Sequence, residues 1–389
     1  MPILAEKEYC TGCTACASAC PRECISMIAD EDGFSYPQID AQKCIRCGLC
    51  EKICPVLHSC VTETDLPRAY AAYSKDESIR MESSSGGIFT ELAKRILHEG
   101  GVVFGAAYNE RFEVNHICIE QEKDLCRLRG AKYAQSNLDG IFTEIKIRLQ
   151  KDQLVLFSGT PCQVAGLKAY LQRKFEKLIT VDFVCHSVPS PRAWGEYVHY
   201  RAKQDHGGKM PVEINLRSKI TGWSRYQYSN MFLYEDGSMH TARSGDSLYM
   251  RLFVGGLISR NACEHCRFKG YSRVSDLTVG DFWGIWDIAP EMDDNRGTSV
   301  ILVQSEQGAA LLEKVADSLV LKQVSLEEAS RQNPAMVAQI RGNDRKHEAM
   351  KRIRSGKIDA CRKLLEGSQN RILSGIKRQV GRLLRGGNE

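Results

Sequence analysis

Two runs of cysteine carry the most specific chemistry in this sequence. They read Cys-x2-Cys-x2-Cys-x3-Cys-Pro, begin at Cys10 and Cys44, and hold eight of the 17 cysteines. Three thiolates on a tight loop can cap three corners of a cubane, while the fourth thiolate of each run ligates the other cluster. The spacing predicts two [4Fe-4S] clusters, one held by Cys10, Cys13, Cys16 and Cys54 and the other by Cys44, Cys47, Cys50 and Cys20.

Two other uses of cysteine fit this pattern less well. A zinc ribbon needs two CxxC pairs and leaves the third and fourth cysteines of each run without a role. Disulfides need an oxidising compartment, but the first ten residues lack the apolar core of a signal peptide and no run of about 18 apolar residues could span a bilayer. We therefore expect a cytoplasmic protein whose thiols are available to iron.

Four further cysteines could hold a third cluster. Cys162 and Cys185 each follow an apolar run that predicts a strand, and neighbouring strands of a doubly wound sheet end at one crevice. The pair Cys263-x2-Cys266 would complete a set of four ligands, although a zinc pair or separate structural thiols would also fit. The remaining cysteines have no partner pattern and are expected to be ordinary thiols: Cys24, Cys60, Cys118, Cys126 and Cys361.

A polar loop, Ser83–Gly87, precedes a predicted helix. Hydroxyls and glycine amides at a helix N-terminus can bind the phosphates of a flavin or nucleotide. A serine followed by glycines is equally an ordinary way to begin a helix.

The elements that must position these residues follow from hydrophobic periodicity. Buried strands are expected at 69–74, 102–108, 154–159, 177–184 and 298–304, with helices at 87–100, 163–174 and 306–319. This alternation predicts an α/β domain with a mostly parallel or mixed sheet. Alternation around a Glu-Asp-Gly turn at 230–242 predicts an inserted antiparallel region between 211 and 249.

Charge is uneven along the chain. The formal net charge is +5, but three oxidised clusters of about −2 each would bring it to about −1, so the balance gives no argument for nucleic acid. Basic residues gather after residue 341, and 371–385 has the stripe of a basic amphipathic helix. That helix could lie on an anionic membrane, dock onto a partner protein or pack on its own domain.

Several segments, taken together, resemble the family of coenzyme F420 hydrogenase/dehydrogenase beta subunits. They are SSSGGIFTELAKRIL, RGAKYAQS, FSGTPCQVAGLKAYL, DFVCHSVPSP, NACEHCRFKGYSRVSDLTVGDFWG and NRGTSVILVQSEQG, in that order, and with the cysteine runs they cover residues 10 to about 320. The resemblance implies an iron-sulfur flavoprotein oxidoreductase in which FAD exchanges a hydride with coenzyme F420 or another small substrate. Clusters would pass single electrons onward, to a redox partner protein where one exists.

The resemblance also implies site residues. Ser84, Ser85, Gly86, Gly87 and Thr90 would hold the FAD phosphates, and Lys132, Tyr133, Gln135 and Ser136 would lie along the flavin. Cys162, Cys185, Cys263 and Cys266 would ligate the third cluster, with Asp281, Phe282 and Trp283 as its structural neighbours. Two candidates for chemistry remain: Lys132 as a cation near flavin N1/O2, and His186 as a proton donor or, as we expect, a hydrogen-bonding neighbour of the cluster.

These observations predict five regions. Residues 1–60 form a bacterial-type two-cluster ferredoxin domain and 61–68 a linker. Residues 69–150 and 151–335 form the two parts of an α/β flavin-binding domain, the second carrying the third cluster, and 336–389 a basic helical tail. Two rival functions remain open: an electron-transfer subunit that feeds a separate partner enzyme and has no substrate site of its own, and a cluster-bearing scaffold or sensor without flavin.

Overall fold

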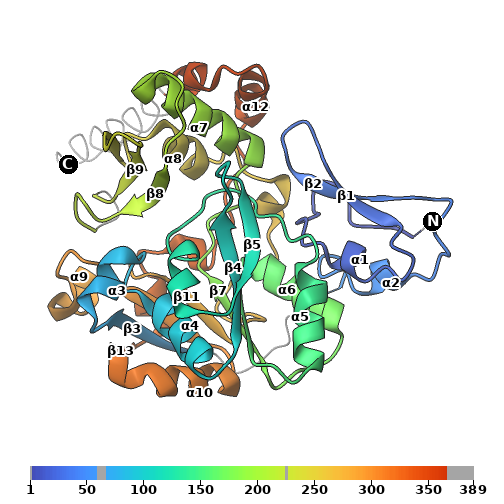
Figure 1. The fold of residues 1–389 in the computed structure, drawn as a ribbon, viewed down its shortest axis with the longest axis horizontal. Helices are drawn as coiled ribbons and strands as arrows, with labels where there is room; N and C mark the ends of the chain where they lie inside the picture. Colours follow the sequence, from blue (N-terminus) through green and yellow to red (C-terminus); the bar gives the residue numbers. More distant parts are fainter. Residues whose placement is uncertain (1, 59–66, 224–226, 366–389) are drawn as a thin grey trace, which may run out of the picture.

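The N-terminal region forms a small module at one side of the molecule (Figure 1). The computed structural model describes residues 2–58, 67–223 and 227–365. In the module, strand β1 (Ile25–Ala29) pairs antiparallel with β2 (Ser35–Ile39). Each cysteine run contributes one short helix, α1 (Ala15–Ser18) and α2 (Leu49–Lys52), which places the two runs on neighbouring turns of the module.

A mixed sheet of eight strands forms the centre of the body. The strand order is β13-β3-β12-β11-β7-β6-β4-β5. The four central strands β4, β6, β7 and β11 run parallel, and the outer strands pair antiparallel with their neighbours. The strands are β3 (Arg68–Ser74), β4 (Val102–Tyr108), β5 (Val114–Ile119), β6 (Val155–Ser158), β7 (Leu178–Phe183), β11 (Leu277–Asp281), β12 (Ser299–Val303) and β13 (Leu319–Val324).

Successive residues of the central strands belong to two different cores. Val103 of β4 and Leu156 of β6 pack with helices α4 (Ile88–His98) and α10 (Glu306–Val315). Their chain neighbours Phe104 and Phe157 pack instead with α5 (Ile141–Gln150) and α6 (Pro161–Leu171). Since side chains alternate across a strand, the helices cover both faces of the sheet. The expected α/β architecture is confirmed.

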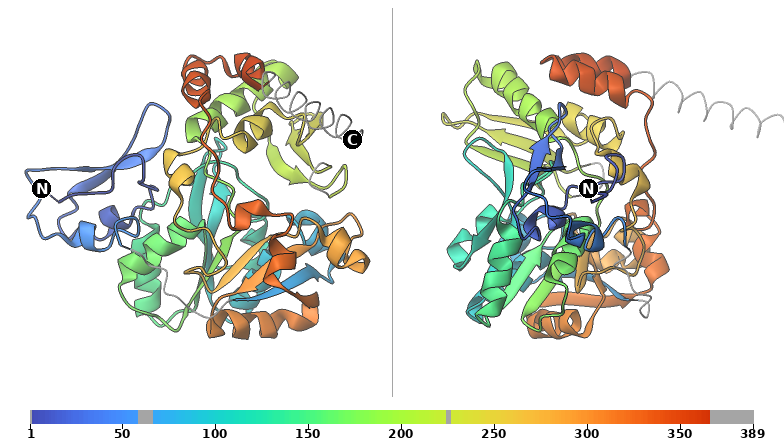
Figure 2. Two further views of the ribbon diagram at one scale, coloured as in Figure 1. Left: turned by 180° about the vertical axis from the view of Figure 1, so that it is seen from behind. Right: turned by 90° about the vertical axis from the view of Figure 1, so that its right-hand side faces the viewer.

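The ferredoxin module joins the second of these cores. Cys13, Ala15 and Ile53 of the module belong to the same buried cluster as α5 and α6. The first cysteine run therefore lies against the body, and the left view of Figure 2 shows the module seated at its side.

The chain between β7 and β11 builds a second unit around a small antiparallel sheet (Figure 1). The sheet has the order β10-β9-β8, from β8 (Glu213–Ser218), β9 (Ser229–Leu233) and β10 (Met239–Arg243). Its core includes residues of α7 (Pro191–His206), α8 (Leu248–Val254) and α12 (Lys346–Arg354). The inserted antiparallel region, with a hairpin between β9 and β10, is confirmed.

Shorter elements complete the described part of the chain. The remaining α-helices are α3 (Glu77–Glu82), α9 (Ile285–Ile288) and α11 (Leu326–Ser330), and the 3-10 helices are η1 (Glu122–Arg127), η2 (Asn261–His265), η3 (Pro290–Met292), η4 (Ala316–Ser318), η5 (Pro334–Met336) and η6 (Ile358–Cys361). No helix within the described ranges is both long and apolar enough to cross a membrane.

The structure describes only the first part of the predicted tail. This part, through α12 and η6, packs against α7. The predicted amphipathic helix at 371–385 lies outside the described residues, as do Cys60 and most of the predicted linker.

Candidate functional site

The first cysteine set lies at the inner side of the ferredoxin module. Burial above all, and also the neighbouring thiols of Cys10 and Cys54, raise the pKa of the Cys13 thiol to about 12. Cys16 has its pKa raised by burial and by Cys13, Cys10 and Cys54. The structure therefore brings Cys54 of the second run to the three leading thiols of the first run.

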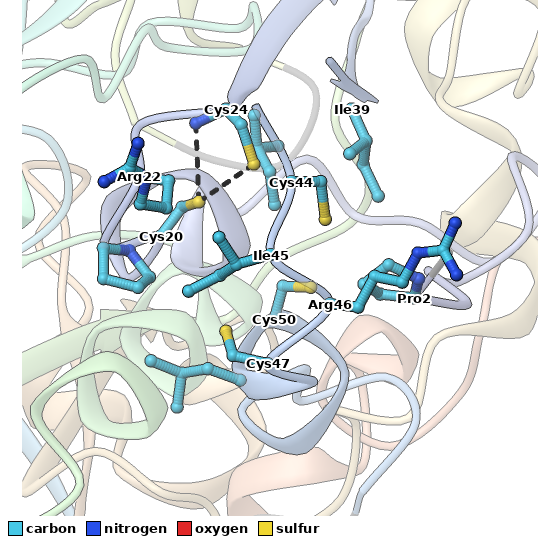
Figure 3. A pocket seen from close by; sticks show the side chains of 13 residues that line it. Pro2, Cys20, Arg22, Cys24, Ile39, Cys44, Ile45, Arg46, Cys47 and Cys50 are labelled. Atoms are coloured by element: carbon cyan, nitrogen blue, oxygen red, sulfur yellow. Dashed lines mark hydrogen bonds between the residues drawn. The ribbon is translucent and has the colours of Figure 1, made fainter. Parts of the chain in front are cut away.

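The second set lines one pocket, shown in Figure 3. Cys20 from the first run and Cys44, Cys47 and Cys50 from the second contribute to this pocket. Cys24 also lines it, with its Sγ 3.3 Å from that of Cys20. Burial favours a raised pKa at the Cys20 thiol. Several hydrogen-bond donors, the backbone N–H of Cys24 first among them, outweigh burial and lower the pKa of Cys20. Cys24 is buried, as expected, but it contacts a predicted ligand.

The third set forms where three parallel strands meet loops. Cys162 stands at the start of α6, directly after β6, and Cys185 follows β7. Cys263 lies in η2 and Cys266 just after it, on the segment that leads into β11. Strands β6, β7 and β11 are neighbours in the sheet, and burial raises the pKa of the Cys162, Cys185 and Cys263 thiols to about 12 each. Neighbouring thiols of the same set raise all three further, so the four cysteines lie together.

The first and third sets adjoin each other across α6. An added Cβ at Gly166 would lie 2.8 Å from Cβ and 2.9 Å from Sγ of Cys13, so the absence of a side chain lets the module approach the helix. Cys162 is near enough to raise the pKa of the Cys13 thiol. The two thiol sets are therefore neighbours in space.

None of these sets is a site for a single ion. In the described ranges, no group of three or more Cys, His, Asp or Glu side chains is arranged to bind one metal ion. In a [4Fe-4S] cluster the four thiolates bind four different irons, so its ligands surround a larger group.

The segment Lys132–Ser136 runs beside the third set. The amide of Gln163, the residue after Cys162, donates to Ser136 Oγ at 2.8 Å. Gln135 Oε1 accepts from Arg260 at 2.7 Å, and Tyr133 Oη accepts from Arg217 at 3.2 Å. The predicted flavin-contacting residues thus connect the third set with a buried arginine of the small sheet.

Lys132 begins this segment, and His186 lies near it. The Lys132 ammonium donates to the carbonyl oxygens of Arg127 and Arg129 at 2.9 and 2.6 Å, and burial lowers its pKa to about 7. The ring of His186 meets the ring of Phe253 edge-on, with centroids 5.1 Å apart, and Phe253 also contacts the ring of Tyr133. One candidate for chemistry therefore belongs to this segment, and the other lies beside it.

The loop Ser83–Gly87 is partly occupied by contacts within the protein. Ser85 Oγ donates to the carbonyl of Thr298 at 2.8 Å, and the Gly86 N–H donates to Ser299 Oγ at 2.9 Å. Thr90 Oγ1 lies 2.9 Å from Ser83 Oγ, and the Gly87 N–H donates to the Ser84 carbonyl at 3.3 Å. In the described part of the chain, Ser84 Oγ is buried without a hydrogen-bond partner, so of the predicted phosphate-binding side chains it is the one available to a ligand.

Two buried cations, Arg80 and Lys219, lie beside this loop, and a third, Arg217, lies near Lys219; sequence reasoning missed all three. Arg80 pairs with Asp294 through two hydrogen bonds of 2.6 and 2.7 Å, and Arg217 pairs with Asp281 at 2.8 Å. Lys219 donates to the Ser85 carbonyl at 2.6 Å and to the Arg80 carbonyl. Burial, and then the nearby Arg80 charge, lower the pKa of Lys219 to about 7. Arg217 lies near the end of β8 and Lys219 directly after it, and two basic residues so close to the end of a strand could have signalled a site.

An aromatic cavity of about 320 Å³ adjoins these cations. Trp223, Trp283, Trp286 and Phe282 contribute to its lining, and the Arg217 guanidinium lies over the rings of Trp223 and Trp283 at 4.4 and 5.4 Å. Phe282 and Trp283 therefore face this cavity, and Asp281 pairs with Arg217, while their predicted place beside the third cysteine set stays a prediction.

Comparison with known families decides what kind of protein this geometry belongs to. The model described as coenzyme F420 hydrogenase/dehydrogenase, beta subunit N-term, matches residues 69–142, and the model for the C terminus of the same subunit matches 152–329. Residues 9–57 match a 4Fe-4S dicluster domain. The chain belongs to the family of coenzyme F420 hydrogenase/dehydrogenase beta subunits. It is thus an iron-sulfur electron-transfer protein of an oxidoreductase family.

Individual relatives within and around this family are distant. One component of the F(420)H(2) dehydrogenase of Methanosarcina mazei is 22% identical over 81% of this chain and 84% of its own length. Coenzyme F420-dependent sulfite reductase of Methanocaldococcus jannaschii is 26% identical over 84% of this chain, which spans 48% of that relative. A chain of the F420-reducing [NiFe] hydrogenase complex from Methanosarcina barkeri covers 78% of this chain, with 92% of its own length matched, 18% identity and a TM-score of 0.46.

Proposed function

We propose that this chain is an iron-sulfur flavoprotein that passes electrons between three [4Fe-4S] clusters, FAD and an organic hydride donor or acceptor, with coenzyme F420 as the first candidate. The observation that carries the proposal is the gathering of Cys162, Cys185, Cys263 and Cys266 beside the Cys13 loop. A cluster held there would lie between the ferredoxin module and the segment Lys132–Ser136. As an expectation from the sequence, the protein would work in the cytoplasm.

The residues around the Ser83–Gly87 loop fit a flavin nucleotide. The buried Ser84 hydroxyl and the N-terminus of α4 offer donors to a phosphate, and Arg80 and Lys219 place positive charge behind the loop. When bound, FAD would supply hydride chemistry: it would accept two electrons and a proton as a hydride, give the two electrons singly to a cluster, and release the proton to solvent. The cations would hold the anionic parts of FAD and the aromatic cavity would exclude water from its apolar parts.

Lys132 is the group that we propose to act on the reacting ring. Its ammonium is held by two carbonyl oxygens and, with a pKa of about 7, can donate a proton or keep its charge near neutral pH. A charged Lys132 beside a reduced flavin would stabilise the anionic ring. His186 would modulate the third cluster, because it follows Cys185 directly in the sequence.

An electron would leave through the second cluster. Cys47 is exposed, and Ile45 beside it is 60% exposed, so this part of the module is open to a partner protein. The same observation favours a second candidate function: an electron-transfer subunit whose substrate site belongs to a partner enzyme.

Cofactor analysis tests the main proposal. The protein is purified anaerobically, and iron, acid-labile sulfide and released flavin are measured per chain. We expect about twelve irons and about one FAD. A Cys263→Ala/Cys266→Ala variant should fall to about eight irons, since only the third cluster loses ligands. About eight irons and no flavin in the unmodified chain, even after reconstitution, would contradict the flavoenzyme.

Anaerobic reduction separates the two candidate functions. Reduced F420, other deazaflavins and reduced nicotinamides are mixed with the purified chain, and flavin absorbance is followed. Bleaching of the flavin by one of these donors in the isolated chain supports a substrate site of its own. Bleaching that requires an added partner enzyme supports the electron-transfer subunit.

A further inference from the structure

One buried arginine ties the ferredoxin module to the body. Arg260 is 1% exposed and immediately precedes η2, the segment that carries Cys263. Its guanidinium donates to the Cys10 carbonyl at 2.7 Å, to Gln135 Oε1 at 2.7 Å and to the Ser35 carbonyl at 3.0 Å. Two of these acceptors belong to the module and one to the segment predicted to lie along the flavin, so a single side chain joins three parts of the protein.

The surroundings of Arg260 allow little movement. The guanidinium lies over the ring of Tyr36 at 4.1 Å. An added Cβ at Gly12, where φ is +68°, would lie 3.0 Å from Arg260 Nη1 and 2.6 Å from Gln135 Nε2. The Cys10–Cys13 loop can therefore approach Arg260 this closely only with glycine at position 12.

The charge of Arg260 is not balanced by a carboxylate. All three acceptors are neutral oxygens, and among the described residues no Asp or Glu forms an ion pair with it. Predicted cluster ligands stand on both sides of it: the Cys263 N–H donates to the Arg260 carbonyl at 3.1 Å, and the Arg260 guanidinium donates to the Cys10 carbonyl at 2.7 Å. A buried cation without a partner is strongly unfavourable, so an anionic group beside it would resolve the imbalance.

We propose that Arg260 is the positioning residue of electron transfer between the first and third clusters, and that its charge raises the reduction potentials of both. The inference rests on the cluster assignment proposed above. In the step concerned, the reduced third cluster loses one electron and the oxidised first cluster gains it, or the reverse. Each reduced cluster carries one more negative charge than the oxidised one, and a fixed cation beside it stabilises that state.

The test compares two substitutions that differ in charge. Arg260→Gln removes the charge, whereas Arg260→Lys keeps it and loses the forked donor geometry. Midpoint potentials are measured on the anaerobic, cluster-loaded chain by redox titration followed with electron paramagnetic resonance. Arg243→Gln, an exposed arginine of β10, serves as a control with the same charge change.

We expect Arg260→Gln to shift the one-electron reduction equilibria of the first and third clusters at least tenfold toward the oxidised state, which is about 59 mV for one electron. Arg260→Lys should retain most of the unmodified potential, and the second cluster should not shift. Retention of clusters in Arg260→Lys but not in Arg260→Gln would also support the inference, because it shows that a cation is required.

Three results would overturn the inference alone: unchanged potentials in Arg260→Gln with full iron content, equal shifts in both variants, or loss of clusters in both. About eight irons in the unmodified chain would instead contradict the proposed function itself, and this inference with it.

Discussion

The contact between Gly166 and Cys13 gives a sharp test of how the ferredoxin module sits. Gly166→Ala removes a poor helix former from α6, which by itself should stabilise the protein by about 1 kcal/mol. The new methyl group, however, would lie 2.8 Å from Cys13 Cβ, well inside the ordinary contact of about 3.5–4.0 Å between carbon atoms. Overpacking of this kind costs about 1–3 kcal/mol. The net free energy of unfolding should therefore be unchanged or lower by up to about 2 kcal/mol.

A matched glycine provides the control. Gly195 lies within helix α7, and an added Cβ there would meet nothing within 4 Å. Gly195→Ala should show the gain of about 1 kcal/mol without the overlap, so the two variants should differ by about 1–3 kcal/mol. Urea denaturation of the anaerobic, cluster-loaded chain, followed by tryptophan fluorescence, gives the comparison as a difference in midpoint. Equal midpoints for the two variants would refute the close packing of the module on α6.

Three further perturbations test other parts of the site. The pKa of Lys219 in the folded chain is lowered to about 7, so between about pH 7 and pH 10.5 the unfolded chain binds one more proton at this group than the folded chain does. The free energy of unfolding should therefore rise with pH across that window, by at most about 1.4 kcal/mol per pH unit. Lys219→Met should flatten this rise in denaturation curves measured at a series of pH values. Cys24→Ala should keep the iron content but lower the potential of the cluster held by Cys20, since a thiol 3.3 Å from that sulfur is lost; unchanged potentials in a redox titration would count against this. Asp281→Asn leaves the buried Arg217 without its carboxylate and should lower the free energy of unfolding by about 3 kcal/mol, measured with urea at constant pH; a change below about 1 kcal/mol would show that the pair is not needed.

Local patterns were enough to predict the elements of the fold. Hydrophobic periodicity placed α4 and α10 to within a few residues, because each has one apolar stripe; α10 ends at Val315 rather than 319, because residues 316–318 form the 3-10 helix η4. It was less accurate for α6, which begins at Pro161 rather than 163 because Thr160 caps it. The antiparallel hairpin followed from its turn.

The candidate site was predictable only where the pattern was local or the topology simple. Strand ends of a parallel sheet bring Cys162 and Cys185 to one edge, so their meeting could be foreseen. The position of Arg260 could not be foreseen, because its three acceptors come from distant parts of the chain, at residues 10, 35 and 135. The loop at 83–87 has a local pattern that was not enough. Its composition suits a phosphate, but only the structure shows that Ser85 already donates to Thr298 and that Gly86 already donates to Ser299 of β12.

A cluster held by the third cysteine set would also fasten the small-sheet unit to the main sheet. The chain leaves the main sheet after β7 at Cys185 and returns to β11 past Cys263 and Cys266, and everything between forms that unit or leads to it. A cluster bound there would act as a covalent cross-link that closes a long loop at its base, and closing such a loop restricts the unfolded chain by an amount on the order of 4 kcal/mol. Oxygen that destroyed the cluster would then do more than stop electron flow. It would loosen the base of the unit that carries Arg217 and Lys219, so damage to the cluster would spread to the buried cations and to the aromatic cavity beside them.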